Sequence, residues 1–370
     1  MRPIFLLLLI FLIINVFIGI GVFMTAKTAQ YFHLRCPTWL KIILGATALL
    51  PPFGLIYFMN RGGITADILY DAAAIVLGIL MLYFFMLIAT EIFRLFLPLS
   101  LPTFGLIAVT GTILLSTYGI WNSWHPIVKE VNITMTNLPQ KIKAVQLSDI
   151  HLGHFRAAGY LQKIVDIVNA QKPDVVFITG DLFDGNQRVS MQTIAPLKNI
   201  HAPIYAVQGN HDIYAGWTKV DSLLRQTGVH VLENEMTIYK GIQLIGLLNT
   251  TADKQSFDIH GFKLAHTIKS ILAKLDIDPD RPSILLHHSP IGVEYARQKG
   301  IDLFLAGHTH GGQMFPITII NHYFFTYNKG LYHDGATKVY VTQGVGTFGP
   351  PMRIGTDSEI TVINISPKQN

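Results

Sequence analysis

Residues 302–312 read DLFLAGHTHGG, a short apolar run followed by two histidines that are separated by one residue. In an extended segment, residues i and i+2 point to the same side, so the side chains of His308 and His310 can reach a common point. The glycines around them allow other backbone to pass close by. This pattern is typical of a metal site, but such a site needs further ligands from elsewhere in the chain.

Four other segments follow the same plan, in which a short apolar or β-branched run ends in Asp, Asn or His. They are KAVQLSDIHLG (143–153), DVVFITGDLFDG (174–185), PIYAVQGNHD (203–212) and SILLHHSP (283–290). Such runs, bounded by Gly or Pro, indicate buried strands. Helical spacing between them, at 157–170 and 261–275, predicts an α/β domain, whose sites lie at the carboxyl ends of its strands.

The polar residues at these five strand ends are carboxylates, an amide and imidazoles, without a thiol. The single cysteine, Cys36, lies far away in the sequence. Oxygen and imidazole ligands suit Mn, Fe, Zn or Ni. The candidate ligands exceed what one ion needs, whereas two ions about 3.5–4 Å apart would use them, with one carboxylate shared.

In order and spacing, the five segments resemble the motifs of the calcineurin-like metallophosphoesterase family, over about residues 141–365. GHTHGGQMFP (307–316) and QGVGTFGPPMRIG (343–355) resemble its bacterial membrane-anchored branch, which includes YkuE- and YaeI-type proteins and is distantly related to UDP-2,3-diacylglucosamine pyrophosphatases. The resemblance implies a four-layer α/β/β/α sandwich around two divalent metal ions such as Mn, Fe or Zn.

The resemblance also implies roles for individual residues. The first metal would be bound by Asp149, His151 and His310, and the second by Asn210, His288 and His308. Asp181 would bridge the two metals, and His211 would act as the catalytic histidine that protonates the leaving oxygen. His287 stands beside His288, and the spacing to Pro290 favours His288 as the ligand.

Two arginines are candidates for binding the substrate phosphate, because a guanidinium can fork onto phosphate oxygens. They are Arg156, shortly after the first motif, and Arg353, in a Gly/Pro-rich loop; for both, the alternative is a surface arginine in a loop. The aromatic stretch NHYFFTYNKGLY (321–332) is either a flap that dips into lipid or a core strand with a hairpin.

The front of the chain has a different composition. Residues 1–125 carry nine charged side chains, whereas residues 126–370 carry forty-two. A bilayer core needs about 20 apolar residues in a helix. We therefore expect an all-α transmembrane anchor in residues 1–125 and the phosphoesterase domain in residues 126–370. The anchor is predicted to hold about four helices, at 4–25, 40–59, 70–90 and 100–120.

The charges also bear on location and partners. The net charge is +5 with a pI near 9.1, but no block of Lys and Arg points to nucleic acid. We expect an integral protein of a bacterial inner membrane, whose partners are the lipid bilayer and a phosphorylated small molecule or lipid substrate. Lys27, Arg35 and Lys41 make the first loop the more basic side, which favours an extracytoplasmic catalytic domain.

These features predict a membrane-anchored, dinuclear metal-dependent phosphoesterase that uses a metal-activated hydroxide on a phosphate ester or pyrophosphate, including a lipid-linked one. A phosphodiesterase or pyrophosphatase is favoured over a protein phosphatase. One alternative is a catalytically inactive metal-binding scaffold or sensor of the same fold. Another is a transporter with a regulatory domain, but Asp67, Asp71 and Glu91 lie near predicted span ends, which favours an anchor.

Overall fold

The computed structural model of this 370-residue chain describes residues 2–253 and 266–368. Contacts within the chain divide it into two compact units. The first comprises Met1–Trp121 with Gly349–Met352, and the second comprises Asn122–Phe348 with Arg353–Asn370.

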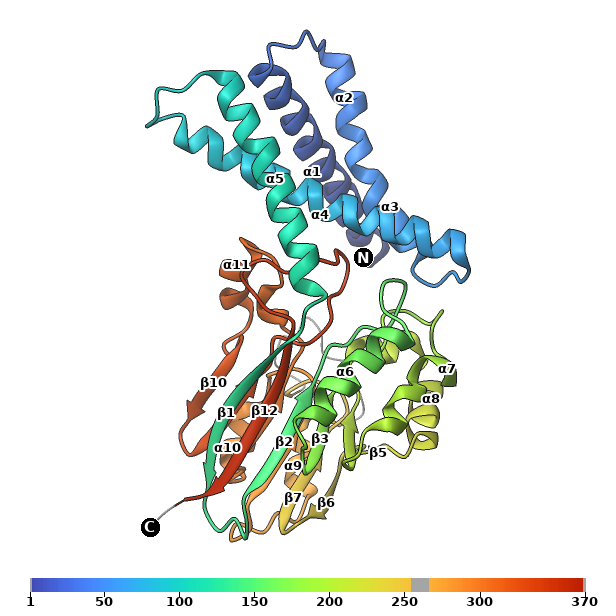
Figure 1. Ribbon diagram of the computed structural model, residues 1–370, viewed down its shortest axis with the longest axis vertical. Coiled ribbons are helices and arrows are strands. Elements are labelled where there is room, and N and C mark those ends of the chain that lie inside the picture. The colour runs from blue at the N-terminus through green and yellow to red at the C-terminus, as the bar shows by residue number, and fades with distance from the viewer. Residues whose placement is uncertain (1, 254–265, 369–370) are drawn as a thin grey trace. The chain divides into compact units, whose positions relative to one another are not determined.

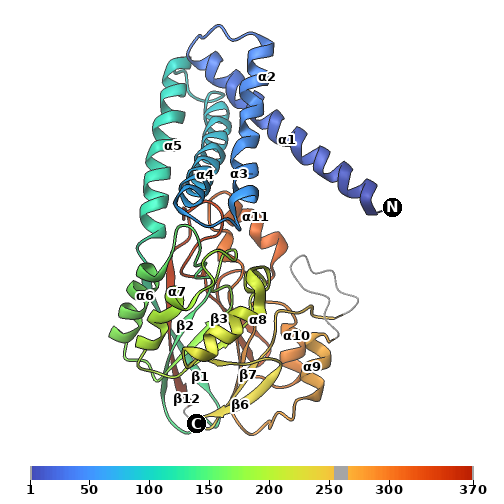
Figure 2. The same ribbon diagram turned by 90° about the vertical axis from the view of Figure 1, so that its right-hand side faces the viewer.

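The first unit is helical and apolar (Figures 1 and 2). Its helices are α1 (Arg2–Tyr31), α2 (Thr38–Ala46), α3 (Leu50–Phe58) and α4 (Ile64–Phe93), followed by α5 (Leu101–Ser123), whose last two residues belong to the second unit. Among the described residues, four segments are long and apolar enough to cross a membrane: Ile10–Tyr31, Thr38–Phe58, Ile64–Phe93 and Leu101–Ser123. The four helices expected from the sequence are therefore confirmed.

The second of these segments is not one regular helix. A 3-10 turn, η1 (Thr47–Leu49), separates α2 from α3. Pro51 and Pro52 follow it and have no backbone N–H to give to the preceding turn, so a break in the α-helical hydrogen bonds falls there. Elsewhere in this unit, side chains of α1, α4 and α5 form one apolar cluster around Tyr31, Leu87 and Phe104.

The second unit is built on two six-stranded sheets. The first has the order β1 (Ile127–Met135), β12 (Glu359–Pro367), β2 (Ile142–Leu147), β3 (Val175–Thr179), β4 (Ile204–Val207) and β5 (His230–Val231). The second has the order β10 (Gly330–Asp334), β11 (Thr337–Val341), β9 (Leu303–Ala306), β8 (Ser283–Leu286), β7 (Ile242–Gly246) and β6 (Glu235–Tyr239).

The two sheets face each other and each is covered by helices on its outer side (Figure 1). Alternation along β3 shows how the sequence achieves this, because successive side chains of a strand point to opposite faces. Phe177 joins the core between the sheets, while Val176 and Ile178 join the core under the outer helices. Those helices are α6 (Ala158–Ala170), α7 (Met191–Ile194) and α8 (Asn210–Gln226).

On the other sheet, β9 alternates in the same way, with Leu305 inside and Phe304 under the helices α9 (Ile268–Lys274) and α10 (Val293–Gln298). The four-layer α/β/β/α sandwich predicted from the sequence is thus confirmed. The helix predicted at 157–170 is α6. Of the segment predicted at 261–275, residues 261–265 lie outside the described residues and α9 occupies most of the remainder.

The direction of the strands brings the predicted polar clusters to one edge of the sandwich. β2, β3 and β4 are mutually parallel in the first sheet, as are β7, β8 and β9 in the second. Their carboxyl ends therefore meet at the same side of the sandwich. The aromatic stretch 321–332 divides between the end of a further helix, α11 (Ile317–Phe324), and the start of the β10–β11 hairpin.

We expect Phe177→Ala to destabilise the chain by about 3–5 kcal/mol, because it removes a large side chain from the closed core between the sheets. The matched control is Ile238→Ala in β6, whose side chain is 48% exposed and leaves no cavity. Thermal denaturation of the detergent-solubilised full chain measures both. Equal melting temperatures for the two variants would contradict the packing described.

Candidate metal centre

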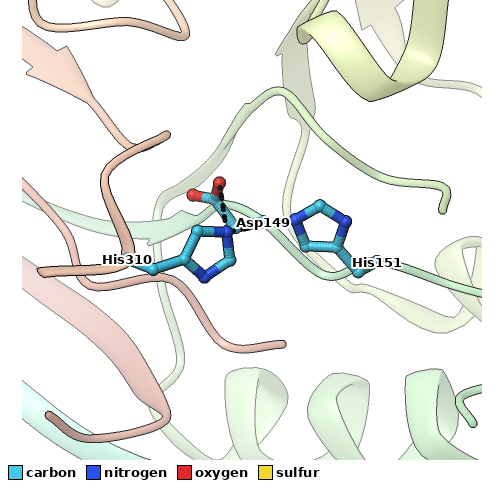
Figure 3. A group of neighbouring side chains, drawn as sticks. All are labelled: Asp149, His151 and His310. Carbon is cyan, nitrogen blue, oxygen red and sulfur yellow. Dashed lines mark hydrogen bonds and ion pairs between the residues drawn. The ribbon is translucent and has the colours of Figure 1, made fainter. Parts of the chain in front are cut away.

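Three side chains from two of the strand ends form a first cluster. Asp149 and His151 follow β2, and His310 follows β9. The Nε2 atoms of His151 and His310 are 3.1 Å apart, and His310 Nε2 lies 3.3 Å from Asp149 Oδ1. All three residues are buried. Figure 3 shows the two rings and the carboxylate converging from their loops.

A second cluster lies at the ends of the strands β3, β4, β8 and β9. His288 Nε2 is 3.1 Å from His308 Nδ1, 3.1 Å from Asn210 Oδ1 and 3.2 Å from Asp181 Oδ2. Potential ligand atoms of Asp181, His288 and His308 all lie within 4.8 Å of one another. The four residues predicted to surround a second metal are therefore brought together.

The carboxylate of Asp181 lies between the two clusters. Its Oδ2 is 3.2 Å from His288 Nε2 in the second cluster and 3.7 Å from His151 Nε2 in the first. Its other oxygen, Oδ1, accepts a hydrogen bond from the backbone N–H of His211 at 2.8 Å. One oxygen of this residue thus faces both groups of imidazoles.

These distances fit bound cations. Nitrogen ligands lie about 2.1 Å from an ion such as zinc, so two adjacent ligands of one ion lie about 3 Å apart at a right angle and about 3.4 Å apart at a tetrahedral angle. The 3.1 Å separation of His151 Nε2 and His310 Nε2 falls between these two values. Two unprotonated ring nitrogens facing each other beside a carboxylate would repel without a shared positive charge. The residues present therefore fit divalent metal ions.

The electrostatics of the site point the same way. Burial opposes ionisation of Asp181, but the imidazoles of His288 and His211 outweigh it and hold the pKa of Asp181 well below its usual range. Burial opposes the charging of His288, but Asp181 and Asp149 raise the pKa of His288 to about 9. By contrast, burial and the neighbouring His211 lower the pKa of His151 to about 3. The carboxylates thus draw positive charge into the site.

His211 lies beside both clusters. It is partly exposed, with 22% of its side chain accessible. Its Nδ1 is 3.1 Å from Asp184 Oδ1, and its ring packs edge-on against His151 at 4.7 Å between centroids. Burial lowers its pKa, but the carboxylates of Asp181 and Asp184 outweigh this and raise the pKa to about 9.

A buried carboxylate, Asp212, organises the loop backbones. It accepts hydrogen bonds from the N–H groups of Gly209, Asp181 and Leu182, each at 2.9 Å. Burial and the nearby charge of Asp181 raise the pKa of Asp212 to about 7. Through these bonds Asp212 fixes the end of β3 against the start of α8, and so the positions of Asp181 and Asn210.

The adjacent histidines point in opposite directions. His288 faces the second cluster, whereas His287 Nδ1 lies 2.6 Å from the Ser289 carbonyl and its ring packs edge-on near Phe304. Neighbouring residues at a strand end alternate between faces, which explains this division. Burial lowers the pKa of His287 to about 4.

Both arginines predicted to bind phosphate are buried and hydrogen-bonded to the protein. Arg353 donates to the carbonyls of Gln343, Gly344 and Gly346, and its Nη2 is 3.3 Å from His310 Nδ1. Arg156 donates to Thr347 Oγ1 at 2.7 Å and to the Ser123 carbonyl at 3.2 Å. A contact with substrate stays a prediction for both, and it would require these bonds to be exchanged.

Two features of the site were not apparent from the sequence. Phe348 is half exposed, and its ring lies 5.0 Å from that of His310 and 6.3 Å from that of His211. The second feature is left-handed backbone at five non-glycine positions, which L residues seldom adopt. They are Asp149, His151, Asp181, His308 and His310. Neither a local motif nor periodicity signals these features, because tertiary contacts impose them.

The chain resembles known proteins over both parts of its length. Residues 142–312 match the family model described as calcineurin-like phosphoesterase. An uncharacterized metallophosphoesterase of Campylobacter jejuni, Cj0846, is 32% identical and covers 99% of this chain and 98% of its own length. The uncharacterized metallophosphoesterase YkuE of Bacillus subtilis is 31% identical over 60% of this chain and 78% of its own.

A third relative is a transmembrane protein by name. The zebrafish (Danio rerio) transmembrane protein with metallophosphoesterase domain is 35% identical over 70% of this chain. The match spans 61% of that protein, and 65% of the length of a Helicobacter pylori metallophosphoesterase. With its four apolar helices, its candidate metal ligands and a relative that matches nearly end to end, this chain belongs to the calcineurin-like metallophosphoesterase family.

Proposed function

We propose that this chain is a membrane-anchored, dinuclear metal-dependent phosphoesterase that hydrolyses a phosphate-ester or pyrophosphate bond. The observation that carries the proposal is the position of the Asp181 carboxylate, with one oxygen facing both clusters of imidazoles. In this proposal Asp181 bridges two divalent ions. Asp149, His151 and His310 hold one ion, and Asn210, His288 and His308 hold the other.

Two divalent cations bound there would supply a nucleophile from water at neutral pH and neutralise the charge on the phosphoryl oxygens. The residues of the chain position that chemistry. The Asp184 carboxylate holds Nδ1 of His211, which leaves Nε2 to give a proton to the leaving oxygen. The backbone N–H of His211 bonds to Asp181, so the proton donor is fixed to the bridging carboxylate. Phe348, against the rings of His211 and His310, limits the access of water.

Replacement of Asp181 tests the bridge. We expect Asp181→Asn to reduce the bound metal from two ions per chain to one or none, because a neutral amide bridges two cations poorly. Asp174→Asn is the matched control, since that carboxylate forms a surface pair with Lys240. Metal content of the full chain, measured by mass spectrometry after Mn²⁺ loading and desalting, checks this. Two ions retained by Asp181→Asn would contradict the bridge.

Hydrolysis tests the catalytic assignment. We expect the full chain with Mn²⁺ to cleave p-nitrophenyl phosphate, bis-p-nitrophenyl phosphate or a detergent-solubilised UDP-glycolipid. Loss of a positioned proton donor costs about 10²–10⁴-fold in rate, so the hydrolysis rate of His211→Ala should fall by that amount. The rate of Asn210→Ala should fall as well, because this variant loses a metal ligand. His201→Ala, an exposed histidine, should keep full activity.

Each outcome of that assay decides between two functions. Turnover lost in Asn210→Ala and His211→Ala but kept in His201→Ala supports the phosphoesterase. Two bound metals without turnover on any of the three esters would instead favour the catalytically inactive metal-binding scaffold. The preferred ester would separate a diesterase or pyrophosphatase from a monoesterase.

We propose that the chain lies in a bacterial inner membrane with the metal-binding domain on the extracytoplasmic side. The support is the positive charge around the first loop, with Arg35 in the loop and Lys27 and Lys41 in the helices on either side of it. Cys36 lies in the same loop and is the only cysteine of the sequence. We expect a membrane-impermeant maleimide to label Cys36 in lysed membranes but not in intact spheroplasts. Labelling in intact spheroplasts would reverse the orientation.

A further inference from the structure

The helix α11 (Ile317–Phe324) follows directly after the loop that carries His308 and His310, and its apolar side chains point outward. From Leu303 to Asn328 the sequence contains no Asp, Glu, Lys or Arg. Tyr323 is 86% exposed and Phe324 62% exposed. We name as the α11 apolar face the exposed large hydrophobic residues of this segment, namely Phe315, Ile317, Ile319, Ile320, Tyr323 and Phe324.

The inner side of α11 is held by polar groups. Asn321 is buried, and its Nδ2 donates to the Thr309 carbonyl at 3.2 Å and to Asn328 Oδ1. Thr309 in turn donates to the Asn328 carbonyl. A surface helix in water normally turns its apolar stripe inward and its polar side chains outward. In α11 the buried side chain is the amide of Asn321, while the large apolar side chains are exposed together with His322. The Asn321 amide anchors the helix to the loop between the two metal-binding histidines.

A single loop of the second unit contacts both Asn122 and the start of α11. Asn122, in the last turn of α5, donates to the carbonyls of Arg353 and Thr356 at 3.1 and 2.9 Å. In the same loop, the Ile354 carbonyl accepts from Phe315 N–H at 2.8 Å, and Gly355 lies against Phe315 and Thr318. The loop at residues 353–356 therefore bonds both to Asn122, the first residue of the second unit, and to the residue that precedes α11 by two positions.

We propose that α11 lies in the bilayer–water interface, with the α11 apolar face among lipid acyl chains. Amphipathic helices of this kind insert about 5–10 Å into the headgroup and acyl boundary. Exposed apolar patches mark interaction sites, and the described part of this chain has four segments long and apolar enough to cross a membrane, so a lipid bilayer is an apolar partner available to the chain. The absence of acidic residues from 303–328 also avoids repulsion of lipid phosphates.

The position of α11 in the interface also indicates a class of substrate. This indication rests on the proposed function. The ring of Phe325, directly after α11, lies 5.6 Å from that of His308. A helix embedded beside this histidine would present the metal centre to phosphate groups at the level of the lipid headgroups. The substrate class that follows is a phosphate ester or pyrophosphate carried by a lipid.

Depth-dependent quenching tests the location of α11 without relying on catalysis. In a Cys36→Ser background, Tyr323→Cys in the full chain is labelled with bimane and reconstituted into phosphatidylcholine–phosphatidylglycerol vesicles. We expect doxyl-labelled phosphatidylcholine to reduce the emission by roughly half, and aqueous iodide to have little effect. Lys198→Cys, at an exposed position of the same unit, should show the reverse.

The remaining outcomes overturn the proposal. A label at Tyr323 that is quenched by iodide and insensitive to doxyl lipid would place α11 in water. Protection from both quenchers would place it under protein, such as a second copy of the chain. Ile319→Cys provides a second reporter on the same face, and metal content shows that each labelled chain is folded. Quenching by lipid without hydrolysis would refute the proposed function while leaving the interfacial helix in place.

Discussion

The structure depends on how buried negative charge is balanced at one edge of the sandwich. The carboxylates of Asp149 and Asp181 are nearly inaccessible to water, and an unpaired buried carboxylate costs several kcal/mol. In the chain alone, positive charge drawn onto His288 offsets this cost. Divalent cations would offset it more completely, and they would let the imidazoles act as neutral ligands. Five strands from two sheets end where these charges meet.

The backbone accommodates this convergence at a conformational cost. Left-handed φ angles at non-glycine residues cost of order 1–3 kcal/mol each and persist only where the surroundings impose them. Here they recur at Asp149, Asp181 and His308, each in a turn that directly follows a strand. A Cβ at Gly209 would lie 2.1 Å from Asp181 Oδ1, and one at Gly307 would lie 2.3 Å from Asp149 Oδ2. The carboxylates are thus enclosed by backbone that a larger residue would displace.

The sequence predicts the strands and the convergent residues well, because each strand is a short apolar run and parallel strands share their carboxyl edge. It also separates the apolar helices from the α/β domain, since charge content differs sharply between them. Other features depend on tertiary contacts that no local pattern encodes. The guanidinium of Arg353 donates hydrogen bonds to three backbone carbonyls. The ring of Phe348 packs against that of His310. Asn321, a polar residue of α11, is buried and hydrogen-bonded to the Thr309 carbonyl.

In the function that we propose, Asp181 joins two metal ions in one centre. Electron paramagnetic resonance of the Mn²⁺-loaded full chain at low temperature tests it most directly, because ions about 3.5–4 Å apart that share a carboxylate are magnetically coupled. We expect the signal of a spin-coupled manganese pair. A six-line spectrum of isolated ions at full metal loading would contradict it.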